Sequence, residues 1–385
     1  KEGFRNWVYC TPATEELGRL ILLDSAVNQE RDAEYANRKK FTKHKPALPL
    51  YTQEDAEQSL RRFRRVKRGE WFSPAEPIWV RLHDAGHLLG SNMIEVEVRN
   101  QDPPLRILFS GDVGRYDAPL YHDPAPPPAC DVLVCESTYG NRDHPAGDLL
   151  EGLAEAVNAA AKRGGVMLIA SFSVGRAQQF IYLLQLLIHS KRVPRIPVFL
   201  DSPMAVNATH IYYDHREDHD LAEGELAGRH SVLKGPNVHL SSSTEQSKRL
   251  NHVKGPAVII SSSGMMTGGR ILHHLKQRLP DPANTILLGG FMAEGTRGRT
   301  IQDGKPTVRI HGQDIPNRAA VARVPGLSGH AGRSELLRWL KPLPAPKQVF
   351  LTHGEKESAE DFAATLRRTR QWNVHIPSLG EVVEL

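Results

Sequence analysis

Short apolar runs recur along this chain, and most of them end in polar residues. Short continuous runs rich in Val, Ile and Leu are typical of buried strands. We therefore predict strands at residues 105–112, 131–136, 165–173, 197–203, 257–264 and 348–353.

Apolar residues at helical spacing lie between several of these runs. We predict helices at residues 148–162, 175–189, 335–340 and 358–369;. Strands and helices in alternation indicate an α/β architecture, in which chemistry gathers at the carboxyl ends of strands. The polar residues at such ends are Asp112, Glu136, Asp201 and His353.

An alternating pattern appears in the predicted strand at residues 94–98. Glu95 and Glu97 alternate there with apolar residues, so we expect one face of this sheet to be wet;. Further along, residues 299–311 predict a hairpin that turns at Asp303-Gly304;.

The bulk properties describe an ordinary globular protein with a mild basic bias. A chain of 385 residues exceeds what one core usually organises, so two domains are expected;. The net charge of +5 favours an anionic partner slightly;. The basic run at residues 61–68 adds to this, although a solvated helix face explains such a run equally well;.

Cysteine usage and the absence of targeting signals favour the cytoplasm. Cys10, Cys130 and Cys135 are too few and too scattered for a disulfide framework or a thiolate zinc site;. No apolar run is long enough for a membrane span, and no signal peptide pattern opens the chain;. The chain begins with Lys1 rather than Met, so we expect a fragment of a longer protein.

Two sets of residues suggest a hard divalent metal. His83-Asp84-Ala85-Gly86-His87 follows a predicted strand, and Ser110-Gly111-Asp112 places a carboxylate on a glycine turn. Imidazole and carboxylate without thiolate suit such an ion. Each set taken alone is equally compatible with an ordinary loop or turn.

Two further segments could meet phosphate. His330 lies in Ser328-Gly329-His330, just before a predicted helix whose N-terminus favours anions;. The Ser/Gly-rich loop at residues 261–270 follows a strand and precedes a helix, so its amides and hydroxyls could bind phosphate;. It is not a Walker loop, and a tight strand-to-helix turn is the alternative. The histidines and acids at residues 210–220 are expected to form a solvated face;.

Taken in order, the motifs closely resemble the metallo-β-lactamase/β-CASP nucleases, particularly their bacterial and archaeal ribonucleases. The residues that carry the resemblance, over essentially the whole chain, are Ala85 to Ser91, Phe109 to Asp112, Glu136-Ser137-Thr138-Tyr139-Gly140, Ser261 to Arg270, Ser328-Gly329-His330 and Leu351-Thr352-His353-Gly354.

The resemblance implies a role for each of five residues. His87 and His353 would be zinc ligands, and the carboxylate of Asp112 would bridge two Zn²⁺ ions. His330 would face the scissile phosphate, with Glu136 as the acid that orients it. RNA-acting members carry His at the position of His353, whereas DNA-acting members usually carry an aliphatic residue, so RNA is the expected substrate.

The resemblance also implies a fold and a domain order. We expect a metallo-β-lactamase αββα sandwich with an inserted α/β β-CASP cap. Residues 1–140 and 326–385 would form the sandwich, and residues 141–325 the cap. The family's His-x-His-x-Asp-His signature is absent, so we expect an N-terminally truncated sandwich that lacks half of its ligands and is inactive as given.

The expected reaction is hydrolysis of RNA phosphodiester bonds by water that two zinc ions activate. Single-stranded RNA would be the partner, with a homodimer as a further expectation and no membrane contact. The residues expected against its phosphates are Ser263, Gly264, Gly268, Gly269, Arg270 and Arg176;.

Three alternatives stay open. The chain could be a non-catalytic RNA-binding relative, a DNA-acting nuclease or a small-substrate hydrolase of the same superfamily. The retained histidines and carboxylates disfavour the first, His353 disfavours the second, and the long cap disfavours the third.

Overall fold

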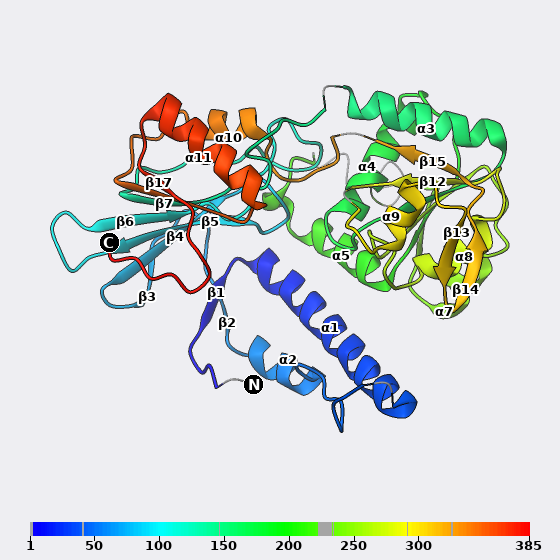
Figure 1. Ribbon diagram of the computed structural model, residues 1–385, viewed down its shortest axis with the longest axis horizontal. Coiled ribbons are helices and arrows are strands. Elements are labelled where there is room, and N and C mark those ends of the chain that lie inside the picture. Colours follow the sequence, from blue (N-terminus) through cyan, green and yellow to red (C-terminus); the bar gives the residue numbers. More distant parts are fainter. Residues whose placement is uncertain are drawn as a thin grey trace. The chain divides into compact units, whose positions relative to one another are not determined.

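The computed structural model describes residues 3–40, 42–145, 147–221, 233, 235–290, 292–324 and 326–385. The chain divides into two compact units (Figure 1). Unit 1 comprises Lys1–Asp143, Glu217–His219 and Gly329–Leu385. Unit 2 comprises His144–Arg216 and Asp220–Ser328.

A seven-stranded mixed sheet forms the centre of unit 1. Its strand order is β17-β16-β7-β6-β5-β4-β3, with parallel pairing from β17 to β6 and antiparallel pairing from β6 to β3. The strands are β3 (Phe72–Ala75), β4 (Ile78–Asp84), β5 (Asn92–Val98), β6 (Leu105–Phe109), β7 (Val132–Glu136), β16 (Gln348–Thr352) and β17 (Val374–His375). The predicted strands at residues 105–112, 131–136 and 348–353 are therefore present.

Two helices, α10 (Arg333–Leu340) and α11 (Lys356–Arg370), cover one face of this sheet (Figure 1). Trp339 and Phe362 from these helices are buried in one core with Leu133 of β7 and Val349 of β16. Burial of such large side chains is the main stabilising contribution to the unit. The functional loops at the carboxyl ends of β6, β7 and β16 therefore stand on a rigid base.

The beginning of unit 1 is a smaller substructure. β1 (Val8–Cys10) pairs in parallel with β2 (Phe63–Arg65), and α1 (Pro12–Lys39) packs against α2 (Gln53–Leu60). Thr11 caps α1, since its side chain accepts a hydrogen bond from the amide of Thr14;. The hydroxyl of Thr14 donates to the carbonyl of Gly90 at 2.6 Å, which ties α1 to the loop after β4.

The expected wet face of β5 is wrong for Glu95 and Glu97. Both glutamates are buried, while Ile94 on the opposite face is 41% exposed. The side chains of Arg81 and His83 approach the same Oε2 atom of Glu95, at 2.8 Å and 2.7 Å respectively. The alternating sequence pattern shows which residues share a face of the strand, but not which face is covered by other residues. Ion pairing with Arg81 and His83 makes the burial of Glu95 possible;.

Unit 2 is built on a six-stranded, wholly parallel sheet with the order β10-β9-β11-β8-β12-β15. Its strands are β8 (Val166–Ala170), β9 (Val198–Asp201), β10 (Val238–Ser241), β11 (Ala257–Ser261), β12 (Thr285–Leu288) and β15 (Ala320–Arg323). Its helices are α3 (Leu149–Arg163), α4 (Arg176–His189), α5 (Pro203–Asp214), α7 (Thr244–Leu250), α8 (Ile271–Arg278) and α9 (Arg297–Gln302). A short 3-10 helix at Arg216–Asp218 begins in unit 2 and ends in the Glu217–His219 segment of unit 1.

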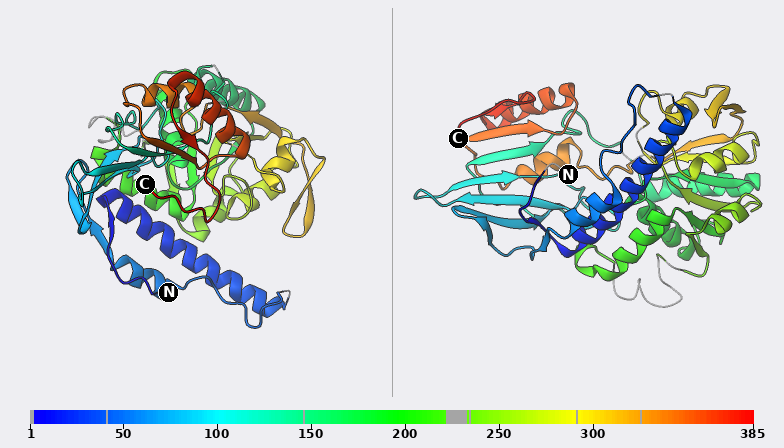
Figure 2. Two further views of the ribbon diagram at one scale, coloured as in Figure 1. Left: turned by 60° about the vertical axis from the view of Figure 1, so that its left-hand side comes forward. Right: turned by 90° about the horizontal axis from the view of Figure 1, so that it is seen from below.

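Helices lie on both sides of this sheet, as Figures 1 and 2 show. Alternate residues of β8 and β11 pack on one side with α8, as in the core that contains Leu168, Ile259 and Leu275. The neighbouring residues of the same strands are also fully buried, as expected for a parallel sheet covered on both faces;.

After the adjacent strands β8 and β11, the chain continues towards opposite edges of the sheet. From β8 the chain continues through α4 to β9, and from β11 it continues through α8 to β12. Such a pair of strands is a topological switch point, and ligands of open α/β sheets bind at the carboxyl edge of that pair. Residues 171–173 and 262–264 lie at this edge.

Two local expectations for residues between 144 and 328 need correction. The hairpin consists of β13 (Thr307–Ile310) and β14 (Gln313–Pro316), so it turns at His311-Gly312 and not at Asp303-Gly304, which follows α9. Within the expected solvated face, His215, Asp218 and His219 are buried. The Asp218 carboxylate pairs with the Arg68 guanidinium at 2.5 Å, and this ion pair compensates its charge in the buried position. The sequence alone predicted a carboxylate exposed to solvent.

The two ends of the segment between the parts of unit 1 are tied together. The amide and hydroxyl of Ser334 donate to the carboxylate of Asp143 at 2.7 Å and 2.8 Å, and the amide of Arg333 donates to the carbonyl of Arg142 at 3.0 Å. We call these four residues the neck. Among the described residues, no helix is both long and apolar enough to cross a lipid bilayer.

Candidate metal centre

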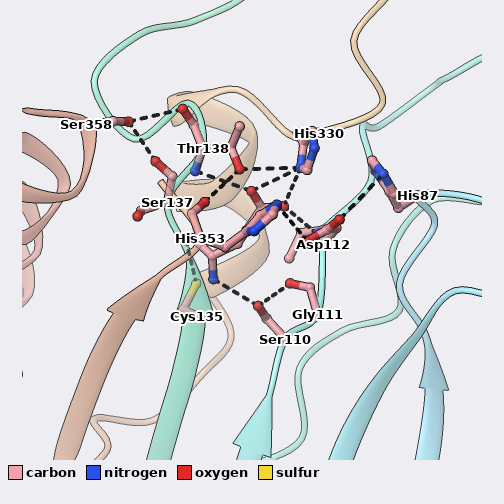
Figure 3. Close-up of polar contacts among 12 residues, drawn as sticks. His87, Ser110, Gly111, Asp112, Cys135, Ser137, Thr138, His330, His353 and Ser358 are labelled. Carbon is pink, nitrogen blue, oxygen red and sulfur yellow. Dashed lines mark hydrogen bonds and ion pairs between the residues drawn. The ribbon is translucent and has the colours of Figure 1, made fainter. Parts of the chain in front are cut away.

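The polar residues predicted at strand ends of unit 1 meet in one place (Figure 3). Asp112 follows β6, on a turn where Gly111 has a φ of +56°. A Cβ at Gly111 would lie 2.9 Å from the carbonyl oxygen of Asn92, so both the backbone angle and the close approach favour glycine;. This turn presents the Asp112 carboxylate at the edge of the sheet.

His87 lies in the loop between β4 and β5. Gly86 precedes it with a φ of +67°, and the amide of His87 donates to the hydroxyl of Ser91 at 3.1 Å. A Cβ on Gly329 would lie 2.8 Å from Cε1 of the His87 imidazole. The ring is therefore packed directly against the backbone that precedes His330.

His353 follows β16 and has a φ of +49°, which a non-glycine residue seldom adopts;. Its carbonyl oxygen accepts a hydrogen bond from the Thr138 hydroxyl at 2.9 Å. The imidazole itself is 59% exposed, so it can reach a ligand at the surface of the unit.

Each oxygen of the Asp112 carboxylate faces a different imidazole. Oδ2 lies 3.8 Å from Nε2 of His87, and Oδ1 lies 3.3 Å from Nε2 of His353. Ligand atoms about 2 Å from a tetrahedral zinc ion lie about 3.3 Å from one another. Each of these two imidazole–carboxylate separations is therefore of the order expected for ligands of one zinc ion.

A second pair, His330 and Glu136, adjoins this carboxylate. Nδ1 of His330 lies 3.2 Å from both oxygens of Glu136, a buried residue that ends β7. The amide of Val113 donates to Oε1 of Glu136 at 2.5 Å, and the amide of Thr138 donates to Oε2 at 3.4 Å. Glu136 is held rigidly and so fixes the orientation of the His330 ring.

The backbone also joins the two loops that carry Asp112 and His330. Gly114 and His330 form an isolated antiparallel bridge, and the amide of Ala331 donates to the carbonyl of Val113 at 2.8 Å. The imidazole centroids of His87 and His330 lie 4.5 Å apart. Side chains separated by more than 200 residues in sequence are thus held at fixed separations.

Thr138 is a residue at this centre to which the sequence motif around Glu136 assigned no role. Its Oγ1 lies 3.5 Å from Nδ1 of His330 while it donates to the His353 carbonyl. One hydroxyl therefore contacts both histidine positions. A single Thr after a strand-end acid carries no signal of such a role, because the two histidines become its neighbours only after folding.

The donor set and its surroundings fit a metal ion. Nδ1 of His87 is buried, and no described residue gives it a hydrogen-bond partner of standard geometry. The pKa of His87 is lowered, chiefly by burial and also by His330, although the Gly329 backbone and Asp112 act in the opposite direction. A neutral imidazole is the form that binds metal. One ligand atom each from His87, Asp112 and His330 lie within 4.8 Å of one another.

Apart from His330, the residues expected to meet phosphate lie in unit 2. Ser263, Gly264, Gly268 and Gly269 belong to the loop after β11, in which the hydroxyl of Ser263 accepts from the amides of Thr267 and Gly268 at 3.0 Å and 3.2 Å. Arg176 opens α4 and donates to Oε1 of Gln179 at 2.6 Å. Some of the amides and hydroxyls that were expected to bind phosphate are therefore already hydrogen-bonded to one another within the loop.

Arg270 belongs to a buried polar network around Asp201. Nη1 of Arg270 donates to Oδ1 of Asp201 at 2.8 Å, while Nε2 of His274 lies 2.6 Å and the hydroxyl of Ser247 2.7 Å from Oδ2. Burial alone would raise the pKa of Asp201. The three hydrogen bonds lower it by more than burial raises it, so the pKa of Asp201 is lowered overall. Arg270 also donates to the carbonyls of Ser241 and Ser242, so it ties the ends of β9 and β10.

Family models match two parts of the chain. Residues 177–301 match the Beta-Casp domain, and residues 314–377 match the Zn-dependent metallo-hydrolase RNA specificity domain. The first match lies inside unit 2.

Three curated proteins illustrate the likeness. Ribonuclease TTHA0252 of Thermus thermophilus is 34% identical over 93% of this chain and 77% of its own length. Transcription termination factor FttA of Methanosarcina mazei is 30% identical over 95% of this chain, which spans 57% of the factor. An RNase J-like protein of Methanocaldococcus jannaschii is 28% identical over 87% of this chain and 77% of its own length. On the strength of the first of these relatives and of both family models, the chain belongs to the β-CASP ribonuclease branch of the metallo-β-lactamase superfamily.

Proposed function

We propose that unit 1 carries the reaction centre for metal-dependent hydrolysis of RNA phosphodiester bonds. One observation supports this most: the Asp112 carboxylate faces His87 with one oxygen and His353 with the other, beside the His330–Glu136 pair. A divalent-metal site and an oriented acid or base are the parts that phosphodiester hydrolysis needs.

Zinc is the metal that the matched family description names, and two ions are our proposal. One would bind between His87 and Asp112, the other between Asp112 and His353. When bound, zinc supplies a Lewis acid and lowers the pKa of water enough to make a nucleophile at neutral pH. The described residues offer two protein ligands to each position, fewer than the four of a closed structural zinc site.

His330 would act on the leaving group. Because its Nδ1 faces Glu136, its Nε2 is the nitrogen that can meet the substrate;. A proton held at Nε2 would pass to the leaving oxygen, and the positive ring would stabilise negative charge on the phosphoryl group. Glu136 favours the charged form of His330 by ordinary carboxylate–imidazolium attraction.

The substrate is proposed to be single-stranded RNA. The matched RNA specificity description and the ribonuclease names of two relatives support RNA, and His353 at the end of β16 agrees with it. The proposal that the RNA is single-stranded depends on a group of unit 2 residues that we place near its phosphates. These residues are Ser263, Gly264, Gly268, Gly269, Arg270 and Arg176. Since the guanidinium of Arg270 already binds Asp201, we expect its effect to be mainly indirect.

We further propose that unit 2 is the β-CASP domain, inserted between residues 1–140 and 326–385 of the metallo-β-lactamase domain. The Beta-Casp match inside unit 2 supports this assignment. The homodimer and the cytoplasmic location stay predictions; sedimentation analysis would test the first and cell fractionation the second.

Because the chain as given is expected to be inactive, the experiment is cleavage of a labelled single-stranded RNA by the protein with the family's His-x-His-x-Asp-His segment restored upstream, with and without a chelator. We expect cleavage that a chelator abolishes and that added Zn²⁺ restores. Cleavage that survives complete metal removal would overturn the metal mechanism. Binding of RNA without any cleavage in the presence of zinc would instead identify a non-catalytic relative.

His330→Ala separates the proposed acid from the proposed ligands. Because a general acid contributes roughly a hundredfold to ten-thousandfold, cleavage should fall by that order while bound zinc stays near the parent level. His353→Ala should lower bound zinc as well as cleavage. Loss of zinc from the His330 variant would mean that this imidazole is a ligand and not the acid.

A further inference from the structure

Phe172 is an exposed aromatic residue at the carboxyl edge of the unit 2 sheet. Its side chain is 55% exposed although Ser171 beside it is only 1% exposed. Among the large hydrophobic residues described in unit 2, Phe172 is the most exposed, and the next is Val321 at 41%. An isolated exposed apolar residue is common in proteins, so its surroundings decide whether it has a function.

The ring of Phe172 is supported from one side. A Cβ on Gly264 would lie 3.2 Å from the Phe172 amide nitrogen and 3.3 Å from Cδ2 of its ring. The glycine backbone therefore packs directly against the phenyl ring, and any side chain there would crowd it. A ring that is fixed on one side and exposed on another is a suitable stacking surface.

Three serine hydroxyls meet at the same edge. The hydroxyl of Ser173 donates to that of Ser262 at 2.8 Å and lies 3.3 Å from that of Ser202. These serines follow β8, β11 and β9 respectively, and only Ser262 belongs to the loop that the sequence predicts to bind phosphate. Ser202 is buried and its hydroxyl also accepts from the amide of Ala205, so Ser173 and Ser262 are the partly exposed members of this group. We call the three residues the serine triad.

The position of this patch in the fold favours a ligand. Phe172 and Ser173 follow β8 and Ser262 follows β11, the two strands at the topological switch point. Arg176 begins α4 three residues after Ser173, which places a cation nearby in sequence. An aromatic ring, hydroxyl donors and a cation together match a nucleotide, whose base stacks and whose phosphate accepts hydrogen bonds.

We infer that Phe172 is a stacking platform for one nucleobase of single-stranded RNA, with the hydroxyls of Ser173 and Ser262 hydrogen-bonding the adjoining phosphate. This inference rests on the proposed function, because it assumes that RNA is the ligand. It adds a nucleotide-binding subsite that lies wholly in unit 2 and uses none of the metal-centre residues. Stacking does not depend on hydrogen-bond readout, so the subsite accepts any base.

The test uses fluorescence anisotropy with the full chain in EDTA, so that binding is measured without cleavage. The probes are a labelled single-stranded RNA and an oligomer of equal length with the same ribose-phosphate backbone but no bases. Phe172→Leu removes the ring and keeps an apolar side chain, whereas Phe172→Trp keeps a stacking surface. Unfolding midpoints of both variants, compared with the parent, confirm that they fold.

We expect Phe172→Leu to weaken RNA binding about tenfold, within the range of base–aromatic stacking, and Phe172→Trp to bind at least as tightly as the parent. On the oligomer without bases, Phe172→Leu and the parent should bind equally. Equal RNA affinity of Phe172→Leu and the parent would overturn the subsite while leaving the proposed function intact. If the parent itself fails to bind RNA, the RNA substrate and the subsite are both wrong.

Discussion

Nδ1 of His330 lies 3.2 Å from each carboxylate oxygen of Glu136, although 194 residues separate them in sequence. The carboxylate is itself fixed by the amides of Val113 and Thr138. In the proposed mechanism this relationship makes Glu136 a positioning residue, which would act on the substrate only through the imidazole.

Glu136→Gln should lower RNA cleavage by about tenfold to a hundredfold, as is usual for partners that orient a functional imidazole. The amide keeps the size of the side chain but removes its charge. Bound zinc should not change, because Glu136 faces His330 and not the proposed ligands. Single-turnover cleavage and metal analysis on the same sample measure both quantities.

Glu357→Gln, on the exposed side of α11, is the control for the loss of one carboxylate and should behave like the parent;. Unchanged cleavage in Glu136→Gln would show that the contact with His330 has no part in the reaction. Loss of zinc would show that Glu136 supports the metal ligands as well.

Gly329→Ala should weaken zinc binding by about tenfold or more. The added Cβ would lie 2.8 Å from Cε1 and 3.1 Å from Nδ1 of His87, so the imidazole must move away from its place beside Asp112. Gly329 does not have a positive φ, so the backbone itself tolerates alanine and the clash is the only cause.

Competition with a zinc-sensitive dye measures the change in affinity. Gly290→Ala is the matched control, since a Cβ there meets no atom within 4 Å. Parental zinc affinity in Gly329→Ala would mean that His87 is not a ligand in this position.

Asp201→Asn should destabilise unit 2 by about 3 kcal/mol at neutral pH, because it leaves Arg270 and His274 without their buried partner;. The pKa of Asp201 is lowered in the folded state, so its ionised form stabilises the fold above the unfolded-state pKa. That contribution is lost as the pH falls through the folded-state pKa;. The difference between variant and parent should therefore shrink below about pH 4.

Urea unfolding followed by circular dichroism measures this difference. All five tryptophans lie in unit 1, so their fluorescence reports that unit separately. Asp303→Asn breaks a half-exposed ion pair with Arg299 and should change stability by less than about 0.5 kcal/mol;. A difference between parent and Asp201→Asn that stays constant down to pH 3 would contradict the assigned role of the carboxylate.

The metal centre was predictable because its residues lie at strand ends. Apolar runs marked β6, β7 and β16, and the rule that functional groups gather at carboxyl ends pointed to Asp112, Glu136 and His353. The structure brings them together with His87 and His330, while their chemical roles stay predictions. Thr138 escaped notice because its importance depends on two neighbours that are distant in sequence.

The errors have a common physical origin. Glu95 and Glu97 were placed on a wet face because alternation gives the period of a strand but not the identity of the covered face. Arg81 and His83 make the burial of Glu95 possible, and such long-range pairing leaves no local trace in sequence. Phe172, Ser173 and Ser202 carry no local signal for the same reason, since separate strands bring them to Ser262 of the predicted phosphate-binding loop.

The hydrogen bonds of the neck hold together the two points at which the chain leaves unit 1 and returns to it. Arg142 and Asp143 are joined to Arg333 and Ser334 by hydrogen bonds, and every side chain of the metal centre belongs to unit 1. Residues 144–216 and 220–328 therefore lie outside the unit that carries the metal centre, whereas Glu217–His219 belong to it through the ion pair between Asp218 and Arg68. A replacement for unit 2 would have to preserve both the two joined ends and this ion pair to leave unit 1 unchanged.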